Sequence, residues 1–152
     1  MTLRDRLQMQ LKDAMKAKEA DRLSTLRLIN AAIKDREIAA RGDAEAADVG
    51  EADILAILGR MVKQRQESAR AYDEGGRPEL AAKELAEIAV IGEFLPRQMD
   101  EGEVQAAIAA AIAESGAGSI RDMGKVMAVL KGRFAGQMDF GAVGPMVKDR
   151  LG

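Results

Sequence analysis

Residues 79–99, ELAAKELAEIAVIGEFLPRQM, contain the pattern that decides the fold. On a helical wheel of about 100° per residue, most of their large apolar side chains fall in one broad arc. Leu95-Pro96 should end this helix, because proline has no N–H to donate and disfavours helical geometry in the residue before it. Asp100 and Glu103 then have the spacing of a capping box. The stretch therefore predicts a break between two helical units.

Helical periodicity continues on both sides of this break. The helices predicted before it occupy residues 2–18, 22–41, 53–72 and 78–95. Small apolar residues fill the repeating positions, and aromatic residues make up only 3 % of the chain, so Ala, Leu, Ile and Met must form the core. We predict an all-α protein with an N-terminal multi-helical unit over residues 1–95 and a smaller C-terminal helical bundle over residues 96–152. Residues 42–51, GDAEAADVGE, lack this periodicity and predict an exposed loop.

Composition excludes several classes of chemistry. The chain has no Cys and no His, hence no thiol nucleophile, disulfide or imidazole base. This excludes His-based triads and the usual zinc enzymes, and we predict neither a metal nor a cofactor. With 23 basic and 25 acidic residues, there is no global signature of nucleic-acid binding. No apolar run approaches the roughly 18 residues that a membrane span needs, and the first residues do not read as a secretory signal. A soluble, cytoplasmic and monomeric protein is the expectation.

Five polar residues fall on otherwise apolar helix faces. They are Asn30 and Glu37 in the second predicted helix, Arg65 in the third, and Glu84 and Glu87 in the fourth. A carboxylate on a core-facing surface is costly unless it is paired and hydrogen-bonded. We predict that Arg65 crosses the interface to Glu84, Glu87 or Glu37, because a guanidinium can serve two carboxylates at once. We favour a structural network over a catalytic acid pair, because the sequence shows no candidate nucleophile to act with these acids.

Basic residues gather towards the C-terminal end. Residues 119–152 contain six basic and three acidic residues, a net charge of +3. The candidate contacts to a phosphate backbone are Gly124, Lys125 and the Lys131-Gly132-Arg133 segment, which is predicted to be a loop. Glycines permit close approach, and lysines attract phosphates. The plainer alternative, favoured by these residues alone, is that the charges only solvate small helices. Stacking aromatics are scarce, so contact by shape and phosphates with a folded RNA is the mode that fits.

Taken in order, several segments resemble the YqeY family of small bacterial proteins over essentially the whole chain. The resemblance is carried by Leu23-Ser24-Thr25-Leu26-Arg27, Val62-Lys63-Gln64-Arg65, Lys83-Glu84-x-x-Glu87-Ile88, Phe94-Leu95-Pro96-x-Gln98-Met99 and Ser119-Ile120-Arg121-Asp122-Met123-Gly124-Lys125-Val126-Met127. From about residue 95 onward the chain is also similar to the tail domain of GatB, a subunit of the glutamine-dependent aspartyl/glutamyl-tRNA amidotransferase. In that enzyme the tail is a helical module that helps to hold tRNA, and the catalytic sites lie elsewhere.

The resemblance implies a link to amidotransferase biology. The leading hypothesis is a non-catalytic, tRNA-associated accessory module, whose C-terminal bundle touches RNA through Lys125, Lys131 and Arg133 while its N-terminal unit meets a protein partner. One alternative is a component of a carbon–nitrogen ligase with glutamine as amido-N-donor, which would need Glu84 and Glu87 in an open cleft. No Ser/Lys nucleophile arrangement and no ATP and magnesium site is visible in the sequence, so enzymatic activity stays open. Another alternative is a protein–protein adaptor, recognisable by an exposed apolar patch.

Overall fold

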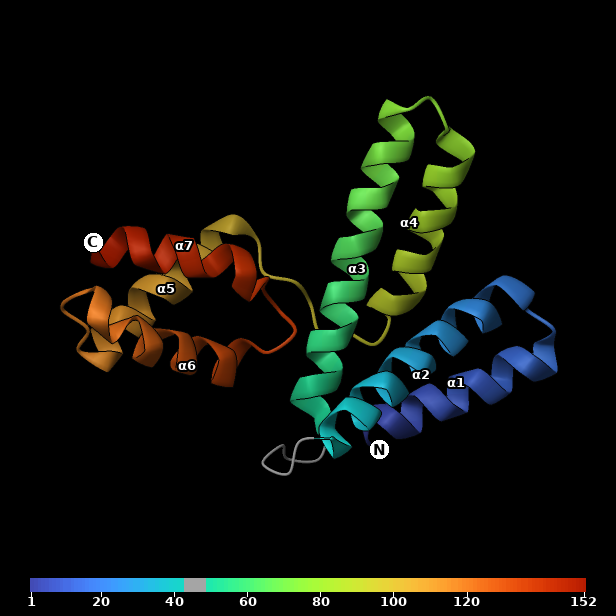
Figure 1. Ribbon diagram of the computed structural model, residues 1–152, viewed down its shortest axis with the longest axis horizontal. Helices are drawn as coiled ribbons and strands as arrows, with labels where there is room; N and C mark the ends of the chain where they lie inside the picture. Colours follow the sequence, from blue (N-terminus) through green and yellow to red (C-terminus); the bar gives the residue numbers. More distant parts are fainter. Residues whose placement is uncertain (43–48) are drawn as a thin grey trace. The chain divides into compact units, whose positions relative to one another are not determined.

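The computed structural model describes residues 1–42 and 49–152, and the regular elements in that part of the chain are helical (Figure 1). This confirms the predicted all-α class. The α-helices are α1 (Leu3–Ala17), α2 (Ala20–Arg41), α3 (Glu51–Glu74), α4 (Pro78–Gly92), α5 (Glu101–Ser115), α6 (Met123–Phe134) and α7 (Phe140–Leu151), with a 3₁₀ turn, η1 (Ile120–Asp122), before α6. The chain divides into two compact units, Met1–Leu95 and Pro96–Gly152.

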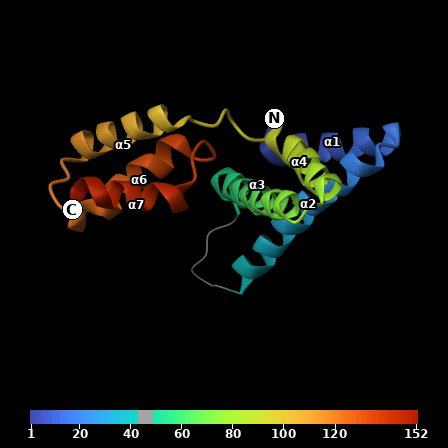
Figure 2. The ribbon, with the colours of Figure 1, turned by 90° about the horizontal axis from the view of Figure 1, so that it is seen from above.

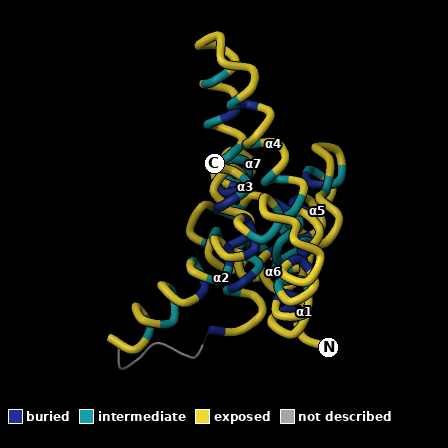
Figure 3. The backbone as a smooth tube through the Cα atoms, turned by 90° about the vertical axis from the view of Figure 1, so that its right-hand side faces the viewer, coloured by how far each residue is buried: buried dark blue, intermediate teal, exposed yellow. Residues whose placement is uncertain are grey.

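The first unit is built from two helical hairpins, α1–α2 and α3–α4. Figure 2 shows α3 beside α4, and α2 contacts both of them, so α2 joins the two hairpins. The core at this junction contains Leu26, Ile29, Ile54, Leu58, Ile91 and Phe94. Further along the α3–α4 hairpin, beyond Met61 on α3, the fully shielded apolar side chains are alanines, Ala69 and Ala81. The end of this hairpin is accordingly mostly exposed (Figure 3).

The second unit packs α5, α6 and α7 around its own core. That core contains Val104, Ile108, Val126, Leu130, Val143 and Val147. The unit is closed at its start by two hydrogen bonds to the α6–α7 connection. Met99 N–H donates to the Gln137 carbonyl at 2.9 Å, and Gln98 Nε2 donates to the Gly136 carbonyl at 2.6 Å. The entry segment is therefore held by the connection between α6 and α7.

Capping explains where two of these helices begin. Thr2 Oγ1 accepts the Asp5 N–H at 3.1 Å at the start of α1, and the Asp100 carboxylate accepts the Glu103 N–H at 2.8 Å at the start of α5. In both cases the third helical residue bonds back to the cap, which completes a capping box. At the other end of α5, Gly116 has φ +69°, a left-handed conformation that favours glycine.

Most predicted helix ends are shifted by one to three residues, and hydrogen bonds explain two of these shifts. α3 begins at Glu51 rather than at Asp53, because Asp53 lies within the first turn and its carboxylate accepts the Gly50 N–H at 3.1 Å. α4 ends at Gly92, before the predicted stop at Leu95. The N–H groups that follow bond to carbonyls three residues back, so the chain tightens into a turn before the proline is reached.

The loop predicted over residues 42–51 lies largely outside the described residues, which resume at Val49. Val49 is buried in the first core. Glu51 Oε1 accepts the backbone N–H of Leu3 at 2.9 Å. The prediction of an exposed segment is therefore wrong for Val49, whereas Gly50 and Glu51 are exposed.

Candidate functional site

The structure places the candidate nucleic-acid residues on α6 and its approach. Ser119 Oγ accepts the backbone N–H of Arg121, so it caps η1. The Asp122 carboxylate accepts the Gly118 N–H at 3.0 Å, which lowers the pKa of Asp122 below its usual value. Val126 and Leu130 are fully buried and define the inner side of α6. The opposite side of α6 faces solvent.

We call this outer side the α6 strip, with Gly124, Ala128 and Gly132 along it and Lys125 and Lys131 at its edges. All five residues are exposed. A Cβ added to either glycine would meet nothing within 4 Å. Glycine inside a helix lowers stability by roughly 0.5–1 kcal/mol relative to alanine. No close packing contact within the unit requires a glycine at either position. The strip leaves the helix backbone open to approach from outside.

The segment Lys131-Gly132-Arg133 is the last turn of α6 and not the predicted loop. Its neighbours along the chain explain this. Leu130 is buried, and Phe134 packs against the same core, so the turn is held to the bundle from both sides of Gly132. Helical geometry then turns Lys131 and Arg133 apart by about 200°. Lys131 stays on the strip, whereas Arg133 leaves it.

The three candidate cations, Lys125, Lys131 and Arg133, differ in how strongly they are paired with a carboxylate. The Lys125 ammonium lies 3.8 Å from the Asp122 carboxylate, and its side chain is 71 % exposed. Arg133 forms an ion pair with Glu114 of α5, which raises the pKa of Arg133 and lowers that of Glu114. Lys131 is exposed and makes no ion pair within the described part of the chain. Lys125 and Lys131 are thus better placed than Arg133 to meet an anion.

Arg65 lies between α3 and α4. Its Nε donates to Glu87 Oε2 at 2.9 Å, and its Nη1 donates to the Met61 carbonyl at 3.1 Å. The two charged side chains are only 14 % and 19 % exposed. Glu84, one turn earlier on α4, is half-buried. The ion pair ties α3 to α4 beyond Met61, where the fully shielded apolar side chains are small.

The other two members of the predicted network lie elsewhere. Glu37 accepts from Arg4 Nη1 at 2.6 Å, and Asn30 accepts from Gln8 Nε2 at 3.4 Å. Both contacts join α2 to α1 and do not reach Arg65. A helical wheel gives the direction of a side chain but not its level along the axis, and this is why the five residues looked like one cluster.

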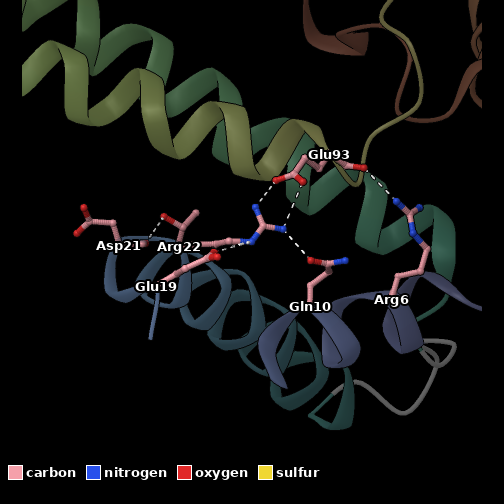
Figure 4. A network of polar contacts seen from close by, with 7 residues as sticks. Arg6, Gln10, Glu19, Asp21, Arg22 and Glu93 are labelled. Atoms are coloured by element: carbon pink, nitrogen blue, oxygen red, sulfur yellow. Dashed lines mark hydrogen bonds and ion pairs between the residues drawn. The ribbon is translucent and has the colours of Figure 1, made fainter. Parts of the chain in front are cut away.

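A further polar cluster at the end of α4 was not predicted (Figure 4). Arg22 donates to the Glu93 carboxylate at 2.5 Å and to Gln10 Oε1 at 2.8 Å. The hydrogen bonds that Arg22 donates to the Glu93 carboxylate raise the pKa of Arg22. Arg6 donates to the Glu93 carbonyl at 3.0 Å and lies 5.5 Å from the centre of the Phe94 ring. Arg22 and Glu93 are 71 residues apart along the chain, and Arg6 and Glu93 are 87 residues apart. Helical periodicity could not have revealed either contact.

Two further findings concern residues 1–42 and 49–152 alone. They contain no group of three or more His, Cys, Asp or Glu side chains that could hold a metal ion. None of their helices is both long enough and apolar enough to cross a membrane.

The amidotransferase alternative requires Glu84 and Glu87 in an open cleft. Glu87 is instead paired with Arg65 within the α3–α4 hairpin.

Comparison with known proteins gives a family and two informative relatives. The family model for Yqey-like proteins (YqeY) matches residues 4–151. "Altered inheritance of mitochondria protein 41, mitochondrial" from Clavispora lusitaniae is 38 % identical over 98 residues, which cover 62 % of this chain and 54 % of that protein. The protein of the same name from Lachancea thermotolerans is 29 % identical over 110 residues, covering 71 % and 57 %. The chain thus spans about half the length of the curated relatives it matches.

The names of these relatives contradict the predicted cytoplasmic location, because they describe mitochondrial proteins. That prediction was drawn from the lack of a membrane span and of a secretory signal, and neither property distinguishes one aqueous compartment from another. The similarity to the GatB tail stays a prediction. The family match extends over nearly the whole length, from the start of α1 to the end of α7. The chain belongs to the YqeY family.

Proposed function

We propose that this chain is a non-catalytic accessory module that contacts tRNA through the α6 strip. The observation that carries the proposal is the exposed, side-chain-poor surface formed by Gly124, Ala128 and Gly132 between two lysines. The choice of tRNA rests on the predicted resemblance of the chain, from about residue 95 onward, to the tail domain of GatB.

The strip suits a phosphate backbone for two reasons. Its small residues allow another backbone to come close to the helix. Lys125 and Lys131 are six residues apart, about 9 Å along the axis at 1.5 Å per residue. They place positive charge on both edges of the approach. Ammonium groups hold phosphates chiefly as point charges, which gives affinity without sequence preference.

The distribution of charge in the second unit supports this orientation. Residues 96–152 contain seven basic and seven acidic residues, so net charge supplies no attraction. Four of the acids, however, belong to α5 or its cap, whereas six of the basic residues follow Gly116. The α6–α7 part is therefore the positive part of the unit, and it is the part that a polyanion would meet.

The lysines are tested by titrating labelled tRNA with the full chain at several salt concentrations. Each phosphate contact changes the slope of log affinity against log salt by roughly −0.7 to −0.9. Lys125→Ala with Lys131→Ala should make the slope shallower by about 1.5, while the control pair Lys12→Ala with Lys16→Ala on α1 should leave it unchanged. An unchanged slope in the first pair, or no binding of tRNA to the parent chain at low salt, would overturn the proposal.

The glycines are tested separately. Gly124→Leu with Gly132→Leu fills the α6 strip, holds another backbone away and should weaken tRNA binding at least about tenfold, or roughly 1.4 kcal/mol. Gly59→Leu is the matched control, because Gly59 is also an exposed helical glycine whose added Cβ would meet nothing within 4 Å. Circular dichroism checks that helix content is kept. Equal affinity in all three proteins would exclude close approach along the strip.

A further inference from the structure

A second positive surface runs along the outer side of α2. Arg27, Lys34 and Arg41 recur at seven-residue intervals, with Ala31 and Ile38 between them. All five are exposed, and 62 % of the Ile38 surface is open to solvent. Figure 3 shows how much of α2 is exposed. We call these five residues the α2 basic face.

The residues of α2 that form this face include no acid. On a helical wheel centred on Arg27, no Asp or Glu of α2 lies within about 60°. The nearest acids within α2 itself are Asp35 and Glu37, roughly 80° away on opposite sides, and Glu37 is already engaged by Arg4. None of Arg27, Lys34 and Arg41 forms an ion pair or side-chain hydrogen bond within residues 1–42 and 49–152. An exposed helix face that only keeps a protein soluble usually mixes both signs.

We propose that the α2 basic face docks an acidic amphipathic helix of a protein partner. Charge complementarity indicates the occupant, because three cations in a row, without ion-pair partners among the described residues, fit a row of carboxylates. Their spacing of seven residues, about 10.5 Å, equals the repeat with which side chains recur along a helix packed lengthwise. Glutamates seven residues apart on the partner would therefore meet all three cations. The surface lies in the first unit and does not depend on the tRNA proposal.

The apolar residues of this face favour a protein helix over a nucleic acid. Along the helix axis, Ile38 lies between Lys34 and Arg41, and Ala31 lies between Arg27 and Lys34. Aliphatic side chains of a partner helix would cover Ile38 and Ala31 and gain from their burial. A phosphate backbone would bring charge onto the isoleucine and gain nothing from it. A protein helix alone uses both the charges and the apolar side chains.

The probe is a capped helical peptide of about 21 residues, with Glu at three positions seven residues apart and Leu beside each. A control peptide has the same composition with its Glu scattered around the helix. Binding to the full chain is followed by fluorescence anisotropy. The patterned peptide should bind at least about tenfold more tightly than the scattered one. Equal affinity of the two peptides, or no binding of either at millimolar concentration, would overturn the proposal.

Variants of the chain locate the contact. Arg27→Glu, Lys34→Glu and Arg41→Glu together should lower affinity for the patterned peptide at least about tenfold, and should bind a peptide with Lys in place of its Glu. The control triple Lys12→Glu, Arg60→Glu and Arg70→Glu changes net charge equally at exposed sites and should keep the parent affinity. Circular dichroism verifies that both triples remain helical. Equal losses in the two triples would mean that only net charge matters, which contradicts the proposal.

Two further readouts separate a helix from RNA. Ile38→Ser should weaken peptide binding about three- to tenfold by removing apolar contact, and it should leave tRNA binding unchanged. The triple reversal on α2 is then titrated with tRNA as well. If it abolishes tRNA binding and Ile38→Ser leaves peptide binding intact, the α2 basic face is a nucleic-acid surface and the proposal is wrong.

Discussion

The α3–α4 hairpin and α6 use charged side chains in opposite ways. In the hairpin, Arg65 and Glu87 are 14 % and 19 % exposed, and the guanidinium also bonds a backbone carbonyl. On α6, Lys125 is 71 % exposed and its nearest carboxylate is 3.8 Å away, while Lys131 is exposed as well. We infer that burial and the number of hydrogen bonds decide the role of a charged side chain here. A buried, hydrogen-bonded one stabilises the fold, whereas an exposed one is available to a ligand.

The largest expected effect comes from the hairpin. Arg65→Ala leaves the Glu87 carboxylate shielded from water without its cation, which should lower the free energy of unfolding of the first unit by about 3 kcal/mol. Urea unfolding followed by the near-ultraviolet signal of Tyr72 measures it, because the chain has one Tyr and no Trp. Tyr72 lies on α3, so its signal reports on this unit.

Two variants sharpen that result. Arg65→Leu with Glu87→Leu removes both charges and should recover most of the loss, because an ion pair of this kind can be replaced by apolar packing. Arg133→Ala, the corresponding change in the exposed pair on α6, should leave the unfolding midpoint of the second unit unchanged within error. If Arg65→Ala lowers stability no more than Arg133→Ala does, the proposed difference between the hairpin and α6 is wrong.

The polar cluster at the end of α4 should show an intermediate effect. Arg22→Ala removes hydrogen bonds to Glu93 and Gln10 at a partly exposed site, which should cost about 1 kcal/mol. Arg22→Lys should restore little, because an ammonium cannot reproduce the guanidinium fork. Amide hydrogen exchange of residues 91–95 measures the change. Unaltered protection in Arg22→Ala would show that the core holds this turn unaided.

The α6 strip should respond in the opposite direction. Gly124→Ala and Gly132→Ala should each raise the stability of the second unit by roughly 0.5–1 kcal/mol, since the added methyl meets nothing and alanine favours helix. Gly59→Ala on α3 should stabilise the first unit by a similar amount. Hydrogen exchange along α6 and α3 compares them. Destabilisation by Gly124→Ala would mean that the strip is already covered by protein.

The smallest effect is a pH dependence at the start of α5. Two hydrogen bonds from Arg97, at 3.0 and 2.5 Å, lower the pKa of Glu103 from 4.5 to about 2. A carboxylate with a lowered pKa in the folded state stabilises it fully above pH 4.5, and the contribution disappears as the pH falls towards 2. Glu103→Gln should flatten the fall in stability of α5 across this window, measured by hydrogen exchange. Glu101→Gln, the control, should leave it unchanged.

Much of the fold was predictable because its signals are local. The apolar period of 3–4 residues marks the helices, and Asp100 with Glu103 marks the start of α5 within one turn of chain. Helix ends were less predictable where a distant residue decides them. Val49 is buried in the core just before α3, and Glu51 at the start of α3 accepts the Leu3 N–H. A loop-like composition reveals neither contact.

The candidate site was predictable only in part. Lys125, a predicted phosphate contact, is exposed on α6. The Lys131-Gly132-Arg133 segment was predicted to be a loop, because the core contact of Phe134 that holds it in α6 is not visible in the local composition. The helical wheel gave Arg65 several possible acids and did not choose among them. The choice depends on the axial level at which α3 and α4 meet, which is a property of the packed hairpin and not of either helix alone.

The most direct test of the account is an NMR titration of the full chain with tRNA. We predict that the amide signals of the α6 strip, including those of Gly124 and Gly132, shift or broaden first. The amide signals around Arg65 and Glu87 should keep their positions and widths. Early perturbation of the α3–α4 hairpin, with α6 unaffected, would contradict the assignment of structural charge to the first region and ligand-binding charge to the second.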